Sequence, residues 1–471
     1  MEQVNYNFSN QRTINILCLF IAILLFVQAV ILLNLPLTDQ IKICLVLQTI
    51  LLGIFTFCSK INTNTYLNPA LLVFSSLYFW HTPMLLFNLI NLNVDFTYTG
   101  NFLEIGADYL SISVAFISLC MAFFVFGSLF GYKKKFNKRL YILRKEHNLA
   151  FYEQIPFFLI FTITNLYFFL IFFSFLGQAY IDLYSSDLEE SILARTLNIT
   201  RFLCIPAILL LFNSLKKSRS LIFATTFTIF LIIINILMGS RSMPFIYSLT
   251  LLVAIDYYIR KISFRLLILV VLIASAASYI IAETRDQSVG FGVFDFNNLG
   301  KNIDFLNLFW SAGGVIRNVI RTFYFAEVSP PLYGSSFLYG FLIVIPSPIL
   351  DWFGLLHFFY IDRPSQWLIN NSSDVPENGG LGFSLIAEVY LNFKLWGCLA
   401  FFPLGWFFAT QFIIFLRASI SYTNIFILSC AIFLTLGIRN DSVTWIRYMV
   451  YTYIILLFYK QLSIPRDRSS R

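Results

Sequence analysis

The sequence predicts an all-α membrane protein that crosses a lipid bilayer about 12 times. Hydrophobic residues make up 58% of the 471 residues and charged residues only 12%, whereas soluble domains average about 25% charged residues. Runs such as 14–33 and 220–238 approach the roughly 20 apolar residues with which a helix crosses the hydrocarbon core. Lys and Arg concentrate in every second connection between such runs, as is typical of a protein with many spans.

The apolar runs define the expected helices along the chain. We expect spans at 14–34, 41–58, 67–91, 108–131, 155–178, 201–215, 220–238, 243–259, 266–282, 394–416, 422–438 and 445–460. The first run is too long for a removed signal peptide, and no small-residue cleavage site follows it, so we expect it to stay in the fold. No internal repeat or low-complexity linker divides the chain, which indicates a single membrane domain over residues 1–471.

The charges of the connections predict the orientation of these spans. Basic residues gather at Lys60, 133–145, 216–219, 260–265, Arg417 and 460–471. Because Lys-rich and Arg-rich loops stay on the cytoplasmic side, these connections should be cytoplasmic. The alternate connections carry Asp95, Glu104, Asp182, Asp187, Glu189 and Glu190. They should face outward, which leaves both termini in the cytoplasm.

One connection is far longer than the others and is predicted to lie outside. It covers residues 283–393 and contains two apolar stretches, 304–326 and 337–360, which are interrupted by Gly313, Gly314, Pro346 and Pro348. We interpret these stretches as short amphipathic or re-entrant helices. The alternative is two further full spans, which would leave both flanks of the loop outside. Since binding and catalytic residues concentrate in loops, function is expected here.

Arginine dominates the basic residues on the predicted outer side. The arginines are Arg195, Arg201, Arg241, Arg285, Arg317, Arg321, Arg363, Arg439 and Arg447, against Lys42, Lys301 and Lys394. A guanidinium grips phosphate oxygens with two parallel hydrogen bonds, whereas an ammonium acts as a point charge. The bias therefore indicates an anionic ligand at the outer leaflet. The alternative is pairing with Glu283, Glu327, Asp362, Asp441 or anionic lipid head groups.

Five of these arginines lie in three local clusters. Arg317 and Arg321 share a helix face, and Glu327 follows them, so that they could hold a pyrophosphate beside a carboxylate or form an ion-pair ladder. Arg241 ends the tight turn 239–241 between two spans. Arg439 and Arg447 bracket the last outer turn, which also holds Asp441. An arginine at a membrane edge is a functional candidate by default.

Few groups on the outer side could act as an acid or base. The candidates for a general base are Glu327, His357 and Glu388, although His357 and Glu388 could equally have structural roles. No GKS/T loop, HExxH, GxSxG or DxD motif occurs, which disfavours ATP hydrolysis, zinc proteolysis, serine-hydrolase chemistry and metal-dependent transfer from sugar nucleotides. The seven cysteines lie in or at the ends of apolar runs without paired short spacing, so neither disulfides nor a zinc site is expected.

The segment 380–397 carries a resemblance to a known family. Its glycines, Ser384, Ala387-Glu388, Tyr390 and Asn392-Phe393 resemble the hallmark of bacterial O-antigen and oligosaccharide repeat-unit polymerases. The turn 239–241 and the layout of many spans with one long outer loop are similar as well. The layout covers most of the chain, whereas the local motif covers fewer than about 20 residues. This chain has Lys394 where the family commonly has glycine after Asn-Phe.

The resemblance implies a glycosyltransferase with a membrane-embedded GT-C-like fold in the bacterial inner membrane. It would act on the periplasmic side, within 283–393 and the adjoining turns, and transfer a growing glycan from undecaprenyl diphosphate to a fresh lipid-linked repeat unit. Arginines would stabilise the departing diphosphate without a metal or cofactor. The diphosphate-binding candidates are Arg241, Arg285, Arg317, Arg321, Arg439 and Arg447. Lipid-linked glycans and the bilayer are the expected partners, with a chain-length regulator and a flippase as further suggestions. The net charge of +8 is spread along the loops, so a nucleic acid is not expected.

Two other functions fit the same composition. A flippase or transporter of lipid-linked oligosaccharide would also bind a diphosphate, but it would place its charges in a central cavity between two related halves. An O-antigen ligase would use nearly the same chemistry and fold. A non-enzymatic subunit of a polysaccharide export complex has less support.

Overall fold

The computed structural model describes residues 8–35, 38–89, 107–133, 192–214, 218–237, 242–270, 315–345, 350, 352–354, 363–372, 383–417 and 422–462. Within these ranges the secondary structure is helical, without a strand. The chain packs as two compact units. Unit 1 comprises Met1–Leu140, Phe309–Arg417 and Leu434–Arg447, and unit 2 comprises Tyr141–Leu308, Ala418–Phe433 and Tyr448–Arg471.

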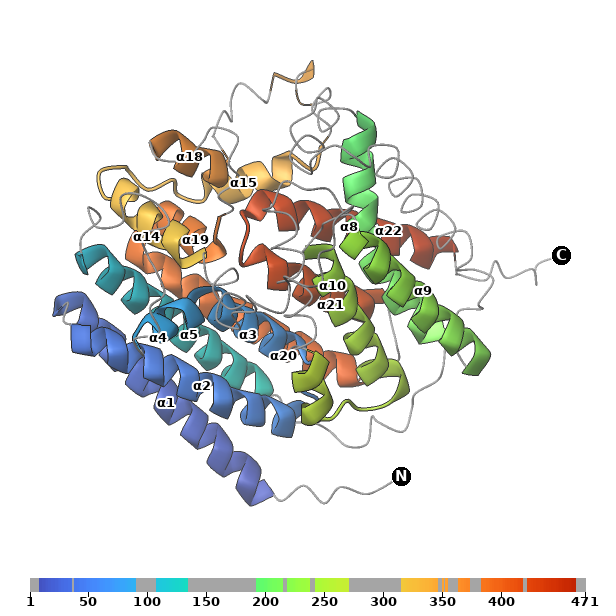
Figure 1. Ribbon diagram of the computed structural model, residues 1–471, viewed down its shortest axis with the longest axis horizontal. Coiled ribbons are helices and arrows are strands. Elements are labelled where there is room, and N and C mark those ends of the chain that lie inside the picture. Colours follow the sequence, from blue (N-terminus) through green and yellow to red (C-terminus); the bar gives the residue numbers. More distant parts are fainter. Residues whose placement is uncertain are drawn as a thin grey trace, which may run out of the picture. The chain divides into compact units, whose positions relative to one another are not determined.

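Unit 1 contains most of the described helices (Figure 1). They are α1 (Phe8–Asn34), α2 (Thr38–Thr63), α3 (Pro69–His81), α4 (Pro83–Leu89), α5 (Ala107–Tyr132), α14 (Val315–Ala326), α15 (Ser335–Leu342), α18 (Pro364–Asn371), α19 (Leu385–Phe393), the 3-10 helix η6 (Lys394–Ala400) and α20 (Phe401–Arg417). Unit 2 contains α8 (Ile192–Ser214), α9 (Ser218–Leu237), α10 (Ser242–Ala254) and the π-helix η5 (Ile255–Ile259). The helices α21 (Tyr422–Gly437) and α22 (Ser442–Leu462) contribute residues to both units.

Four described segments are long and apolar enough to cross a membrane by length and composition: Gln11–Asn34, Asp39–Thr63, Asp108–Tyr132 and Leu385–Ile414. The last of them comprises α19, η6 and the start of α20, with a backbone turn at Lys394. The outer surface of α1 is rich in exposed aliphatic and aromatic side chains, such as Ile16, Phe20 and Val27, which suits contact with lipid. The prediction of a helical membrane protein is thereby confirmed in its coarse form. The 12-span count and the GT-C-like fold stay predictions.

The other predicted spans can be compared with the described helices one by one. The predicted span 67–91 is interrupted, because α3 ends at His81 and α4 begins at Pro83, where proline is favoured at the first helical position. The predicted span 243–259 corresponds to α10 followed by η5. The helices α9, α21 and α22 match 220–238, 422–438 and 445–460 to within a few residues, and α8 covers 201–214 but begins nine residues earlier, at Ile192. The predicted span 155–178 and residues 271–282 of the predicted span 266–282 lie outside the described residues.

The backbones of α5 and α20 approach each other closely because small residues face one another. A Cβ atom at Gly127 of α5 would lie 1.9 Å from Phe402 O, and one at Gly405 of α20 would lie 2.1 Å from Phe124 O. One turn further along α5, a Cβ atom at Gly131 would lie 2.8 Å from Ala409 Cβ. The pattern is a small-xxx-small motif on each helix, which in membranes permits tight packing between helices.

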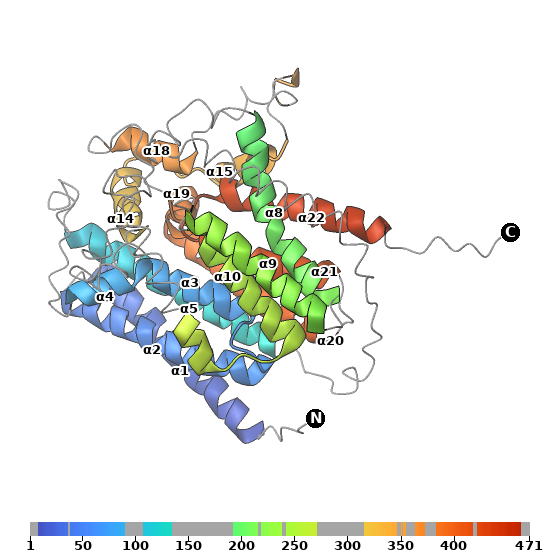
Figure 2. The same cartoon turned by 45° about the vertical axis from the view of Figure 1, so that its right-hand side comes forward.

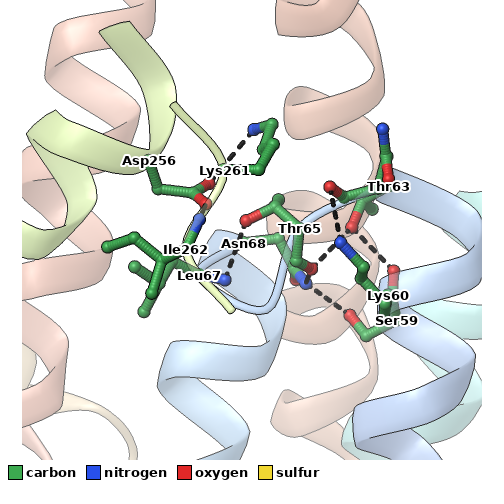
Figure 3. Close-up of polar contacts among 10 residues, drawn as sticks. Ser59, Lys60, Thr63, Thr65, Leu67, Asn68, Asp256, Lys261 and Ile262 are labelled. Carbon is green, nitrogen blue, oxygen red and sulfur yellow. Dashed lines mark hydrogen bonds and ion pairs between the residues drawn. The ribbon is translucent and has the colours of Figure 1, made fainter. Parts of the chain in front are cut away.

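The connection from α2 to α3 is held by buried polar groups (Figure 3). The Asn68 side chain caps α3 by accepting a hydrogen bond from Leu71 N at 2.9 Å, and its amide donates to Ser59 Oγ at 2.6 Å. The Tyr132 hydroxyl at the end of α5 lies 2.7 Å from the same Ser59 oxygen. Polar groups that are buried away from water need partners within the protein. These hydrogen bonds supply such partners and hold the turn in place.

In unit 2, a buried carboxylate closes the turn after η5. Asp256 accepts a hydrogen bond from Ile262 N at 2.8 Å and forms an ion pair with Lys261 Nζ at 3.1 Å, as Figure 3 shows. Ile262 is buried in the connection after the π-helix, and the Asp256 carboxylate gives its backbone N–H an acceptor there. The residue therefore has a structural explanation.

The described part of the long loop contains short helices. The 12-residue α14 is about 18 Å long and the 8-residue α15 is about 12 Å long, both less than the hydrocarbon core requires. One side of α14 is buried through Ile316, Val319, Ile320 and Phe323. Both helices lie beside α19 in the two views (Figures 1 and 2).

Candidate functional site

The helix α19, which carries the segment 380–397, begins at a buried serine. Ser384 caps the helix, since its Oγ accepts a hydrogen bond from Ile386 N at 3.2 Å. The ring of His81 lies against this cap, with Nε2 at 2.8 Å from Ser384 Oγ and Nδ1 at 2.8 Å from Leu77 O. A carbonyl oxygen can only accept, so Nδ1 carries a proton and, in the neutral ring, Nε2 accepts the serine hydrogen. The start of α19 is thereby fixed to the end of α3.

The same end of α19 is joined to the turn that holds Arg439. Phe383 N donates to Arg439 O at 3.3 Å, and Leu385 N donates to Ile438 O at 3.1 Å. The guanidinium of Arg439 lies 5.2 Å from the centroid of the Trp80 ring, a cation-π arrangement. Two candidate segments separated by about 50 residues of sequence, the start of α19 and the turn at Arg439, are therefore in direct contact.

Glu388, one turn into α19, is completely buried and ties three segments together. Its carboxylate accepts hydrogen bonds from Ser336 Oγ of α15 at 2.6 Å and from Ser442 N of α22 at 2.7 Å, and a third from Ser442 Oγ. The carboxylate also lies at the start of α22, where a negative charge is favourable. These contacts give Glu388 a structural role in joining α19 to α15 and α22.

The end of α19 is anchored through Asn392. Its side-chain oxygen accepts from Gly334 N at 2.9 Å, and its amide donates to Ser336 Oγ at 2.7 Å. Backbone bonds add to this, since Leu332 N donates to Leu391 O and Tyr333 N donates to Asn392 O. The polar residues of the family-like motif thus act mainly within the protein, where they position α19.

The chain reverses direction immediately after α19. Lys394 has φ 52° and ψ −142°, a left-handed backbone conformation that favours glycine. After this residue η6 packs back on α19, because a Cβ atom at Gly397 would lie 2.7 Å from Val389 O. In a straight helix these two residues would be about 12 Å apart. The turn forms here with lysine rather than glycine.

The cationic helix α14 lies against α19 and α5. Arg321 is buried, with 3% of its surface exposed, and Arg317 is half-buried. The Phe323 ring of α14 stacks on Tyr390 of α19 with centroids 3.5 Å apart, and Phe116 of α5 contacts both rings edge-on. The ring cluster therefore fixes α14 on α19.

Glu327, immediately after α14, is the exposed acidic candidate. Its carboxylate accepts a hydrogen bond from the Tyr109 hydroxyl of α5. The Tyr109 ring contacts the Tyr324 ring edge-on, with centroids 5.3 Å apart. Glu327 thus combines access to solvent with a fixed neighbour, which Glu388 does not.

The remaining candidates are distributed as follows. Arg447 is half-buried on α22 in unit 1, and Asp441, at the start of that helix, accepts hydrogen bonds from Ser365 Oγ and Thr444 Oγ1, both at 2.9 Å. Arg241, Arg285 and His357 lie outside the described residues. The residues Arg317, Arg321, Glu327, Glu388, Arg439 and Arg447 all belong to unit 1.

Sequence reasoning missed three residues of this site: Trp80, His81 and Tyr109. A signal for His81 was present, because an ionisable residue inside an apolar run is expensive unless it has a partner. Trp80 and Tyr109 gave no such signal, since aromatic residues are common throughout the chain. Their partners, Arg439 and Glu327, are distant in sequence.

No family model matches the chain, and no curated protein or solved structure matches it either. The chemistry of the site therefore has to be argued from its own residues.

Proposed function

We propose that this protein is a membrane glycosyltransferase that polymerises undecaprenyl-diphosphate-linked oligosaccharide repeat units at the periplasmic face of a bacterial inner membrane. The observation that carries the proposal is the joining of α19 to the Arg439 turn, with Phe383 N bonded to Arg439 O and α14 packed on the same helix. Two arginine-bearing segments thereby border the motif that resembles repeat-unit polymerases. The product would be O-antigen or capsular polysaccharide.

Arginine is suited to the leaving group of this reaction. As the bond between the anomeric carbon and the diphosphate oxygen breaks, negative charge develops on the diphosphate, and guanidinium groups aimed at it would stabilise the transition state. Arg439 and Arg317 are both half-buried, and in Arg317 the guanidinium atoms Nε and Nη2 are themselves buried. Trp80 covers one face of the Arg439 guanidinium, so its orientation is restricted.

We assign the general base to Glu327 among the three candidates. The acceptor hydroxyl attacks the anomeric carbon, its proton passes to the Glu327 carboxylate, and the diphosphate lipid leaves with the bonding electron pair. Glu327 is exposed, whereas Glu388 is enclosed by three donors inside the protein. Arg317 and Arg321 lie on α14, and Glu327 follows directly after this helix. A diphosphate bound by the two arginines would therefore lie near the base.

Arg439→Lys is expected to weaken binding of the lipid-linked donor without unfolding the protein. Lysine keeps the positive charge but loses the planar fork and its stacking on Trp80. Loss of one charge-assisted hydrogen bond should raise the KM for the donor about tenfold or more. The measurement is steady-state polymerisation by purified protein in nanodiscs, with melting temperature as the control. An unchanged KM would contradict a diphosphate-binding role for Arg439.

Glu327→Ala is expected to remove activity while leaving the fold intact. Because positioned acid or base groups contribute about 10²–10⁴-fold to a rate, kcat should fall by a factor in that range. The side chain is exposed, so stability should change by less than about 0.5 kcal/mol. Product ladders on gels and thermal unfolding measure the two effects. Wild-type kcat in this variant would exclude Glu327 as the base.

The polymerisation itself can be tested by deleting the gene in the cell that encodes it and displaying the surface glycan on a gel. A single repeat unit on an otherwise normal acceptor would support the proposal. Absence of surface repeats with accumulated lipid-linked polymer would indicate a ligase instead. Repeat units stranded on the cytoplasmic leaflet would indicate a flippase.

A further inference from the structure

The backbone at Lys394 is held in a conformation that a lysine rarely adopts. With φ 52° and ψ −142°, the residue lies in a region where glycine has no steric penalty and a side chain is strained. Such strain persists where surrounding contacts determine the conformation. The side chain of Lys394 must therefore have contacts that glycine could not supply.

Those contacts are with the end of α14. Lys394 Nζ donates one hydrogen bond to Ala326 O and another to Ser329 O, the second at 2.8 Å. The last carbonyl groups of a helix have no partners within the helix, and a lysine beside them satisfies them and suits the negative end of the helix dipole. Ala326 and Ser329 bracket Glu327. The ammonium therefore clamps the backbone on both sides of the exposed carboxylate.

Other contacts around the same point leave little freedom for Glu327. Lys394 Nζ also lies 5.7 Å from the centroid of the Tyr390 ring, which stacks on Phe323 of α14. The Tyr109 hydroxyl donates to the carboxylate itself. The backbone after α14 contributes two long hydrogen bonds. Glu327 N donates to Tyr324 O and Ser329 N donates to Ala326 O, each at 3.3 Å. Of these restraints, the Lys394 clamp alone ties residues 326–329 to the reversal after α19.

We propose that Lys394 is a positioning residue. It holds Glu327 in the position from which Glu327 acts as the base, by donating hydrogen bonds to the carbonyl groups of Ala326 and Ser329. The inference rests on the proposed function for its catalytic part. Lys394 touches no reacting atom in this assignment and acts through the backbone that carries Glu327. The strained backbone conformation at Lys394 is the conformation in which its ammonium group reaches these two carbonyl groups.

Two substitutions separate the clamp from the backbone strain. Lys394→Met keeps a side chain of similar length but removes the donor, and Lys394→Gly removes both the donor and the strain. In both variants kcat should fall about tenfold or more, because small misplacements of a catalytic group have effects of this size or larger. The KM for the donor should stay within about twofold, since the arginines are untouched. Lys394→Arg, which restores donors, should recover most of the lost turnover.

Hydrogen exchange gives a readout that does not depend on activity. Amides of Glu327 and Ser329 should exchange faster in the Met and Gly variants in nanodiscs than in wild type, and slowly again in the Arg variant. Lys42→Met is the matched control, because Lys42 is exposed and pairs only at the surface with Asp39, 3.3 Å away. It should change neither exchange nor turnover.

The outcomes distinguish this inference from the proposed function. Wild-type kcat in the Met and Gly variants would overturn the positioning role, whether or not exchange changes, and so would unchanged exchange at Glu327 and Ser329. A wild-type protein that polymerises no lipid-linked repeat unit would instead overturn the proposed function, and the exchange experiment would still test the clamp.

Discussion

Gly127→Ala is expected to force α5 away from α20 and to destabilise unit 1 by about 3 kcal/mol or more, at the upper end of overpacking effects. The added Cβ atom would lie 1.9 Å from Phe402 O and 2.9 Å from Trp406 N, both backbone atoms that cannot move as a side chain does. A shift of the whole helix is then required. The loss of stability is measured by heating the protein in detergent and recording the fraction that remains monodisperse.

Two comparisons show whether this loss comes from the helix contact. Gly405→Ala approaches the same contact from α20, with its Cβ atom 2.1 Å from Phe124 O, and should have an effect of the same size. Gly53→Ala, in α2, meets nothing within 4 Å and should raise stability by up to about 1 kcal/mol, because alanine favours a helix. Equal melting temperatures for the Gly127 and Gly53 variants would contradict the close approach of α5 and α20.

Glu388→Ala is expected to destabilise the protein by about 3 kcal/mol or more. The substitution leaves three buried donors, Ser336 Oγ, Ser442 N and Ser442 Oγ, without their acceptor, and each buried unsatisfied group has a penalty of about 1–3 kcal/mol. The hydroxyl groups can turn to other acceptors, whereas the Ser442 N–H cannot. The melting temperature in detergent measures the effect.

Glu388→Gln decides between a structural and a catalytic role for this residue. Glutamine keeps one acceptor oxygen for the two serine hydroxyls, but its amide nitrogen would face the Ser442 N–H, so a smaller loss of stability is expected. If Glu388 were the base, the folded glutamine variant would be inactive at temperatures well below its melting temperature. That result would contradict the assignment of Glu327 as the general base. The variant Glu327→Ala serves for comparison, because it removes an exposed carboxylate instead of a buried one.

Much of the secondary structure follows from local properties of the chain. The helices α1, α2 and α5 match predicted spans to within several residues at each end, because a helix in lipid satisfies its own backbone and needs only a continuous apolar run. The reversal at Lys394 falls where the predicted span 394–416 begins. The interruption between His81 and Pro83 was missed although Pro83 marks it in the sequence, because the stretches on both sides are apolar and together have the length of one span.

The candidate site could be predicted only as a set of residue types. An excess of arginine on the predicted outer side and the few acidic groups identified Arg317, Arg321, Glu327, Glu388 and Arg439 as candidates. Nothing in the spacing of Glu388 distinguished a buried structural carboxylate from an accessible one. Its burial depends on Ser336 and Ser442, which lie about 50 residues away on either side.

The sequence by itself determined the class of the protein, the positions of most described helices and a list of charged candidates, because hydropathy and charge act along the chain over one helix length. Only the tertiary structure decided which candidates meet. The contacts of Ser384 with His81, of Arg439 with Trp80 and of Lys394 with the end of α14 join segments that are far apart in sequence. Such contacts depend on which helix surfaces pack together. The small-xxx-small motifs at Gly127 and Gly405 are local patterns, but the sequence does not state that they pack on one another.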